Sequence, residues 1–108
     1  MAHVTLDTSG IHDWDSFHEV SKSTFGSPDF YGRNMNAWGD GLTYLDEGDG
    51  MSNINLGPDE LLHIHLLHSA EFSSALPDVW NEFLSCVAFT NRRYIEREVF
   101  PRLSVILE

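Results

Sequence analysis

The chain has 108 residues, of which 42% are hydrophobic and 12% are aromatic, so it can bury one core without disulfides or a metal. Its 17 acidic and 6 basic side chains give a formal net charge of -11 at pH 7. This charge repels phosphate backbones and anionic membrane surfaces and attracts basic proteins, which argues against direct binding to nucleic acid or membranes. We therefore expect a single domain over residues 1–108.

The cellular location is predicted from what the sequence lacks. The lone Cys86 cannot form an internal disulfide, and its apolar helical context is typical of a small buried side chain. The first residues have neither the basic region nor the apolar run of a secretion signal, and no apolar stretch approaches the length of a membrane span. These features predict a cytoplasmic protein.

The first part of the chain predicts a strand and then a helix. Val4 and Leu6 alternate with polar residues, which predicts a short strand over residues 3–7. Asp13 is suited to cap a helix that ends at Gly26, before Pro28. The apolar residues of this helix keep mostly to three- and four-residue steps and are Trp14, Phe17, Val20 and Phe25.

A second helix is predicted from the cap Asn34 to Leu45, and its two faces differ. At about 100° per residue, one stripe is apolar and is expected to pack on the core. It contains Met35, Trp38, Leu42 and Leu45. Asn36, Asp40 and Thr43 gather roughly 150° away, on the face that we expect to be exposed. Asp40 stands between Gly39 and Gly41, which disfavour a helix interior, so helix propensity alone does not explain this segment.

The second half of the chain completes an α/β pattern. An acidic loop over residues 46–58 precedes a strand over 60–68 with apolar residues on both faces, which predicts a covered central strand. Ser69 is a plausible cap for a short helix to Leu76, and Pro77 is suited to open another, whose pattern becomes unclear from Phe89 to Phe100. Residues 103–107 predict a final strand. The order predicts a small three-stranded parallel sheet packed against three or four helices.

Three histidines, His63, His65 and His68, are candidate metal ligands. His63 and His65 project from the same side of a strand and are placed to share an ion. His68 points to the other face, and no nearby cysteine completes a ligand set. We therefore interpret them as ordinary, partly buried strand histidines and predict no metal site.

No catalytic spacing is present. The chain has no glycine-rich phosphate loop, no nucleophile elbow and no zinc-protease pair on a helix. A small metal-dependent enzyme that uses the histidines would require a bound ion and turnover. We therefore expect a protein that is not an enzyme and has no cofactor.

The stretch around the second predicted helix carries a specific order of residues. It contains Pro28, Asp29, Phe30, Tyr31, Gly32, Asn34, Ala37, Asp40, Leu42 and Thr43. In this order the sequence resembles the barstar family of small intracellular ribonuclease inhibitors. The resemblance is sharp over residues 28–45, and the order of strands and helices along the chain agrees with a barstar-like fold. That fold is a three-stranded parallel sheet packed against helices.

The resemblance implies a binding protein whose second helix and preceding loop enter the active-site cleft of a basic ribonuclease. Asp40 would be the central anchor and take the place of a substrate phosphate, because a carboxylate on a rigid helix accepts paired bonds from guanidinium groups. The residues expected to bind the partner are Phe30, Tyr31, Asn34, Asn36, Gly39, Asp40, Thr43, Tyr44 and Glu47. The two aromatic residues Phe30 and Tyr31 either stack in the cleft or pin the turn onto the core.

The sequence departs from the family pattern at Asn36, where barstar has a second acid, and at Gly39, where it has a large aromatic residue. The acidic loop either replaces the lost contacts or is simply solvated. A late acid contributed by some relatives corresponds to Glu82, Glu96 or Glu98. The departures leave an alternative open, in which a barstar-like fold serves as an interaction or regulatory module without a nuclease target.

Overall fold

The computed structural model describes residues 2–26, 35–43, 45, 54, 56, 57 and 59–108. Within the second helix, the side chains of Met35, Asn36, Ala37 and Asp40 also lie outside the description. The predicted acidic loop therefore falls almost entirely outside the described residues.

A three-stranded parallel sheet forms the base of the fold. Its strands are β1 (Ala2–Asp7), β2 (Leu62–Leu67) and β3 (Leu103–Leu107), in the order β1-β2-β3. Val4 is aligned with Ile64, and Ile64 is aligned with Val105. The predicted α/β class with a small parallel sheet is confirmed, and β2 is the central strand, as expected.

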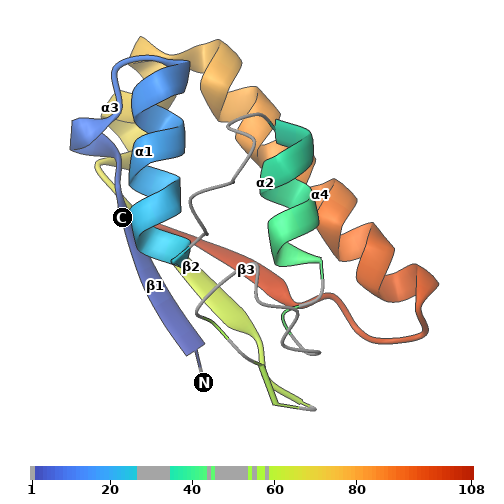
Figure 1. Ribbon diagram of the computed structural model, residues 1–108. Coiled ribbons are helices and arrows are strands. Elements are labelled where there is room, and N and C mark those ends of the chain that lie inside the picture. The colour runs from blue at the N-terminus through green and yellow to red at the C-terminus, as the bar shows by residue number, and fades with distance from the viewer. Residues whose placement is uncertain (1, 27–34, 44, 46–53, 55, 58) are drawn as a thin grey trace.

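The described helices are a short 3-10 helix, η1 (Thr8–Gly10), and four α-helices. The α-helices are α1 (Trp14–Phe25), α2 (Met35–Leu42), α3 (Ser69–Ala75) and α4 (Pro77–Glu96). Figure 1 shows α1, α2 and α4 gathered on one side of the sheet. On β2, Leu62, Ile64 and Leu66 are fully buried, while the alternate residues are partly exposed. The prediction that both faces of this strand are covered therefore holds for one face.

The core between sheet and helices is rich in aromatic rings. Trp38 of α2 meets Phe25 of α1 edge to face at 5.8 Å and Phe83 of α4 at 5.6 Å, measured between ring centroids. Phe83 in turn meets Phe17 of α1 at 6.3 Å. Each such pair adds about 0.5–1.5 kcal/mol beyond the burial of its area. The rings therefore fix α1, α2 and α4 relative to one another.

The ends of α1 follow the predicted signals. The carboxylate of Asp13 accepts a hydrogen bond from the Ser16 N–H at 2.8 Å, and the Ser16 hydroxyl oxygen accepts one from the Asp13 N–H at 3.0 Å. This reciprocal box satisfies N–H groups that a helix start leaves without partners. The hydrogen bond from the Ser16 N–H holds the pKa of the Asp13 carboxyl below its ordinary value. Gly26 ends the helix in the left-handed conformation, with φ of 66°.

Several predicted boundaries differ from the structure, among them those of β2, which was predicted over residues 60–68. Helix α2 ends at Leu42 and not at Leu45, and Ser69 is the first residue of α3 and not its cap. The cap position is taken by His68 with φ of 59°, while the Ser69 hydroxyl donates to the Glu108 carbonyl at 3.1 Å. Helix α4 runs without a break to Glu96, through the segment whose pattern was unclear.

A buried cation fixes the entry to β2. Arg102 is only 2% exposed, and its Nη1 donates to the carbonyls of Gly57 at 3.1 Å and Glu60 at 3.0 Å. Its guanidinium also lies 4.1 Å from the centre of the Phe100 ring. A buried charge is tolerated when it is hydrogen-bonded and stacked in this way. Arg102 thus ties the segment before β2 to the start of β3.

Candidate protein-binding site

The predicted binding helix α2 is attached to the molecule by its apolar stripe. Trp38, Leu42 and Leu45 are all buried, which confirms the inward face predicted from their spacing. The fourth member, Met35, has a side chain outside the described part of the structure. The helix rests on the core through Trp38 and Leu42, and Leu45 anchors the segment that follows it.

Gly39 faces α4. A Cβ atom built at this position would lie 3.4 Å from the Thr90 Oγ1 of α4, and both residues are buried. The missing side chain thus lets α2 approach α4 closely at this point. Gly39 therefore has a packing role within the chain, and its contact with a partner stays a prediction.

Thr43 corrects one expectation. It is 2% exposed, so the prediction that it shares an exposed face with Asp40 is wrong. The helix ends at Leu42, and the Thr43 hydroxyl turns back to donate to the Gly39 carbonyl at 2.7 Å. The Thr43 hydroxyl oxygen also accepts from Arg93 Nη1 at 3.3 Å. Thr43 therefore shapes the end of α2 and is not an exposed binding residue.

The carboxyl end of α2 is closed by side chains of α4. The Tyr94 hydroxyl donates to the Leu42 carbonyl at 2.5 Å and accepts from the Leu45 N–H at 3.1 Å. Arg97 Nη2 donates to the Thr43 carbonyl at 2.9 Å. Helix ends leave carbonyls without partners, and cations near them are favourable, so these contacts stabilise the end of α2.

Sequence reasoning missed these supporting residues. Tyr94, Arg93 and Arg97 fall in the part of the chain where the helical pattern was unclear. Polar side chains in a helix are read as exposed, and their partners on α2 lie about fifty residues away. The one signal in the sequence is that Val87, Thr90 and Tyr94 continue the helical spacing of Val79 and Phe83.

The structure describes the other predicted binding residues in part or not at all. Asn36 and Asp40 lie in α2 by their backbone, and their side chains are outside the described part. Outside it altogether are Phe30, Tyr31, Asn34, Tyr44 and Glu47. Among the three candidate late acids, Glu96 lines a small hollow together with Thr43, Arg93 and Arg97. Glu96 is thus beside the end of α2.

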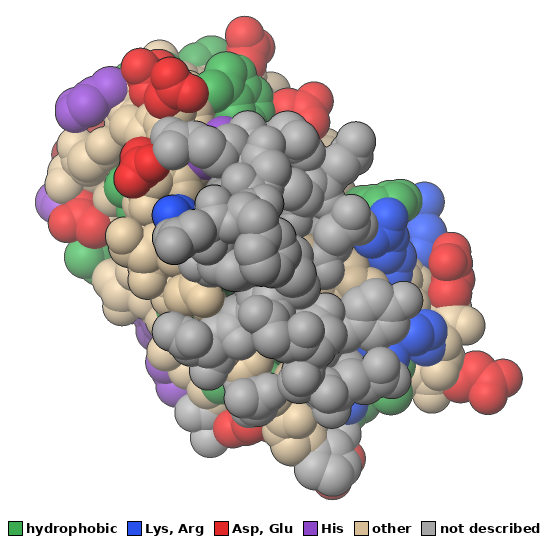
Figure 2. Space-filling view, in the orientation of Figure 1, with side chains coloured by type: hydrophobic (Ala, Val, Ile, Leu, Met, Phe, Trp, Pro, Cys, Tyr) green, Lys and Arg blue, Asp and Glu red, His purple; other side chains and the backbone are tan. Residues whose placement is uncertain are grey.

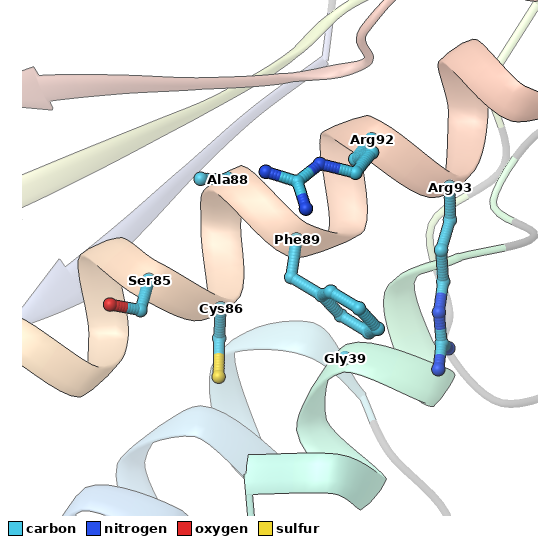
Figure 3. A pocket seen from close by; sticks show the side chains of 7 residues that line it. All are labelled: Gly39, Ser85, Cys86, Ala88, Phe89, Arg92 and Arg93. Carbon is cyan, nitrogen blue, oxygen red and sulfur yellow. The ribbon is translucent and has the colours of Figure 1, made fainter.

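A groove of about 500 Å³ lies between α2 and α4 (Figure 3). Small residues line part of it, namely Gly39, Ser85, Cys86 and Ala88, and the side chains of Phe89, Arg92 and Arg93 border it. The Cys86 thiol is half-buried, and burial together with the nearby Glu82 raises its pKa, so it is a weak nucleophile. Figure 2 shows blue side chains along the edge formed by α4, and they are arginines because the single lysine of the chain, Lys22, lies on α1.

Three histidines of β1 and β2 lie together on the face of the sheet opposite to the buried residues of β2. His3 Nδ1 lies 2.8 Å from His65 Nε2, and His65 Nδ1 lies 2.8 Å from Glu108 Oε1. His63 stacks on His3 with 4.8 Å between ring centroids. His68 lies apart, 3.4 Å from Glu71. Within the described ranges, no group of three or more His, Cys, Asp or Glu side chains is arranged to hold a metal ion.

Comparison with known proteins gives one finding. The family model described as Barstar (barnase inhibitor) matches residues 1–106 of the chain. A search of curated proteins found no match. Among the helices that the structure describes, none is long and apolar enough to cross a membrane.

Proposed function

The chain belongs to the Barstar family, and from this premise we propose that it inhibits a ribonuclease by binding the nuclease active site. The family match along almost the whole chain is the observation that carries the proposal. The inhibitor is not an enzyme, acts in the cytoplasm and contacts no nucleic acid directly. Its target is a basic, secreted ribonuclease toxin, against which it protects the producing cell or its siblings.

The proposed binding face consists of α2 and the segments on either side of it. Asp40 is the anchor, and its carboxylate accepts charge-assisted hydrogen bonds from the Arg and His side chains of the nuclease cleft. The other residues proposed to contact the nuclease are Phe30, Tyr31, Asn34, Asn36, Tyr44 and Glu47. Gly39 and Thr43 support this face through their contacts with α4.

The packing of α2 supports this role for Asp40. Trp38 and Leu42 are buried beneath the helix, and the Tyr94 hydroxyl holds its last turn. A helix that is fixed before binding loses little conformational freedom on binding, so more of the contact energy appears as affinity. The arrangement suits a helix that presents one carboxylate at a set position.

The net charge of -11 supports a basic target. Protein pairs associate at about 10⁵–10⁷ M⁻¹s⁻¹ without steering, and complementary charge raises the rate by orders of magnitude at low salt. Inhibition should therefore begin faster at low ionic strength. The acidic residues Asp46, Glu47 and Asp49, which follow α2 in the sequence, would strengthen this attraction.

The test is inhibition of RNA cleavage by barnase and by any basic nuclease that co-purifies with the chain. Asp40→Ala should weaken binding by about 2–5 kcal/mol, because it leaves cations of the cleft buried without a partner. The chain should still unfold at nearly the same urea concentration. Asp59→Ala removes the same charge from an exposed turn residue and should leave the inhibition constant almost unchanged.

Two results would count against the proposal. If Asp40→Ala inhibits as strongly as the parent chain, Asp40 is not the anchor. If a nuclease binds and stays fully active, inhibition is wrong. That result would favour an interaction module without a nuclease target, a reading to which Asn36 and Gly39 already lend support as departures from the family pattern.

A further inference from the structure

We propose that the groove between α2 and α4 is a second contact site that receives an apolar side chain of the partner with a carboxylate next to it. The inference rests on the proposed function, since the same partner would contact α2. The groove carries positive charge from Arg92 and Arg93, whereas the proposed face around Asp40 is anionic. The partner would then need a cationic cleft and, beside it, an apolar side chain followed by an acid.

The shape of the groove favours an apolar side chain. Its volume is about 500 Å³, and its lining includes Gly39, Cys86 and Ala88, which leave room for a ring or a branched aliphatic group. Phe89 forms a wall of the groove and is 48% exposed, so its ring is accessible to a partner. Covering Phe89 would remove apolar surface from water and so favour binding.

The charge beside the groove selects the neighbouring group. Arg92 and Arg93 border it, in a chain with only 6 basic residues. The Arg93 guanidinium lies 4.5 Å from the centre of the Phe89 ring, so a cation is held over the apolar wall. Figure 3 shows Phe89 and Arg93 both directed toward α2. A carboxylate entering beside the ring would meet positive charge, whereas a lysine or arginine would be repelled.

The same charges argue against a second copy of this chain as the occupant. Two copies would each carry a net charge of -11 and repel one another over most of their surfaces. A basic nuclease that carries a local apolar and acidic patch satisfies both features. The groove would therefore discriminate among basic nucleases, because Asp40 alone suits any cationic cleft.

The direct test uses a dipeptide probe and the full chain labelled with ¹⁵N. N-acetyl-Phe-Asp-amide should shift the amide signals of Gly39 and of residues 85–93, and its neutral analogue N-acetyl-Phe-Asn-amide should bind roughly three- to fivefold more weakly. Arg92→Gln should reduce the difference in affinity between the two probes, because Arg93 alone then faces the carboxylate. Asn81→Asp makes the same charge change on an exposed position of α4 and should leave both affinities unaltered.

The second test asks whether the nuclease uses the groove. Ala88→Phe fills it from an exposed position of α4 and should weaken nuclease inhibition by about tenfold, whereas Ala70→Phe on α3 should not. The unfolding midpoint of each variant checks that the chain still folds.

The proposal is overturned if the probe shifts no signal in the groove, if both probes bind equally, or if Ala88→Phe inhibits as well as the parent chain. Its failure differs from failure of the proposed function. If the parent chain inhibits no nuclease, the dipeptide experiment still shows whether the groove binds an apolar group beside a carboxylate.

Discussion

Replacing Tyr94 with phenylalanine tests how α2 is held in place. Tyr94 is 0% exposed, and its hydroxyl bridges the Leu42 carbonyl at 2.5 Å and the Leu45 N–H at 3.1 Å. Tyr94→Phe keeps the ring and removes only the oxygen. The change therefore isolates the bridge from the packing of the side chain.

The expected cost follows from the two groups that lose their partner. A buried polar group left without a hydrogen bond costs about 1–3 kcal/mol, and the variant leaves one carbonyl and one N–H in this state. Partial rearrangement and the desolvation of the hydroxyl itself reduce the sum, so we expect a loss of about 2–4 kcal/mol. Small domains have a total stability of about 5–15 kcal/mol, so this loss is large.

Urea unfolding measures the effect. The midpoint should fall while the slope of the free energy with urea concentration stays the same, since the exposed area on unfolding is unchanged. The variant should also bind the nuclease more weakly than the parent chain, because the end of α2 is less fixed. A loss below about 0.5 kcal/mol would refute the reasoning, since the bridge would then add little beyond what water supplies.

Two further predictions concern the core and the sheet. Thr90 is 0% exposed, and its Oγ1 has no hydrogen-bond partner among the residues that the structure describes. Thr90→Val should therefore raise the free energy of unfolding, measured with urea, by about 1 kcal/mol, and a clear loss would contradict this. Partial desolvation, and then the charges of the neighbouring His63 and His65, lower the pKa of the exposed His3 from 6.5, so the unfolded chain binds a proton first as the pH falls. The contribution of His3 to the free energy of unfolding is therefore complete above pH 6.5. It is lost as the pH falls from 6.5 through the lowered pKa. His3→Gln should flatten the acid side of the curve of urea midpoint against pH, and an unchanged curve would exclude His3 as the cause.

Much of the fold is predictable because it depends on local patterns. The alternation around Val4, the cap Asp13 and the stop at Gly26 are set within a few residues, and each matches the structure. The inward stripe of α2 is also a local property, since Trp38 and Leu42 lie on one side of any helix. These features need no knowledge of the rest of the chain.

Thr43 and Thr90 show where local patterns stop being sufficient. Thr43 was placed by helical periodicity beyond the last helical residue, so its predicted direction had no basis once α2 ended at Leu42. Thr90 lies in the segment from Phe89 to Phe100 whose helical pattern is unclear in the sequence. In the structure it is buried in α4, because Gly39 has no side chain opposite it. In both cases the outcome depends on how two helices distant in the sequence meet.

The candidate site also has one part that depends on local sequence and one part that depends on the packing of distant helices. The motif around Asp40 is readable in the sequence, because its residues are neighbours along the chain. The groove between α2 and α4 is not, since Gly39 and Phe89 come together only when the helices pack. Whether a cation such as Arg92 adjoins that groove also depends on the packing angle.

The parallel sheet has a consequence for the order of folding events. Val4 is paired with Ile64, sixty residues away, and Ile64 with Val105, forty-one residues away. Each pairing must therefore close a long stretch of chain before any bond between strands repays the lost entropy. Contacts between adjacent helices such as α3 and α4 require a much shorter stretch of chain to be closed. The chain should hence acquire helices before its strands, and a three-stranded sheet should appear as the last and slowest step.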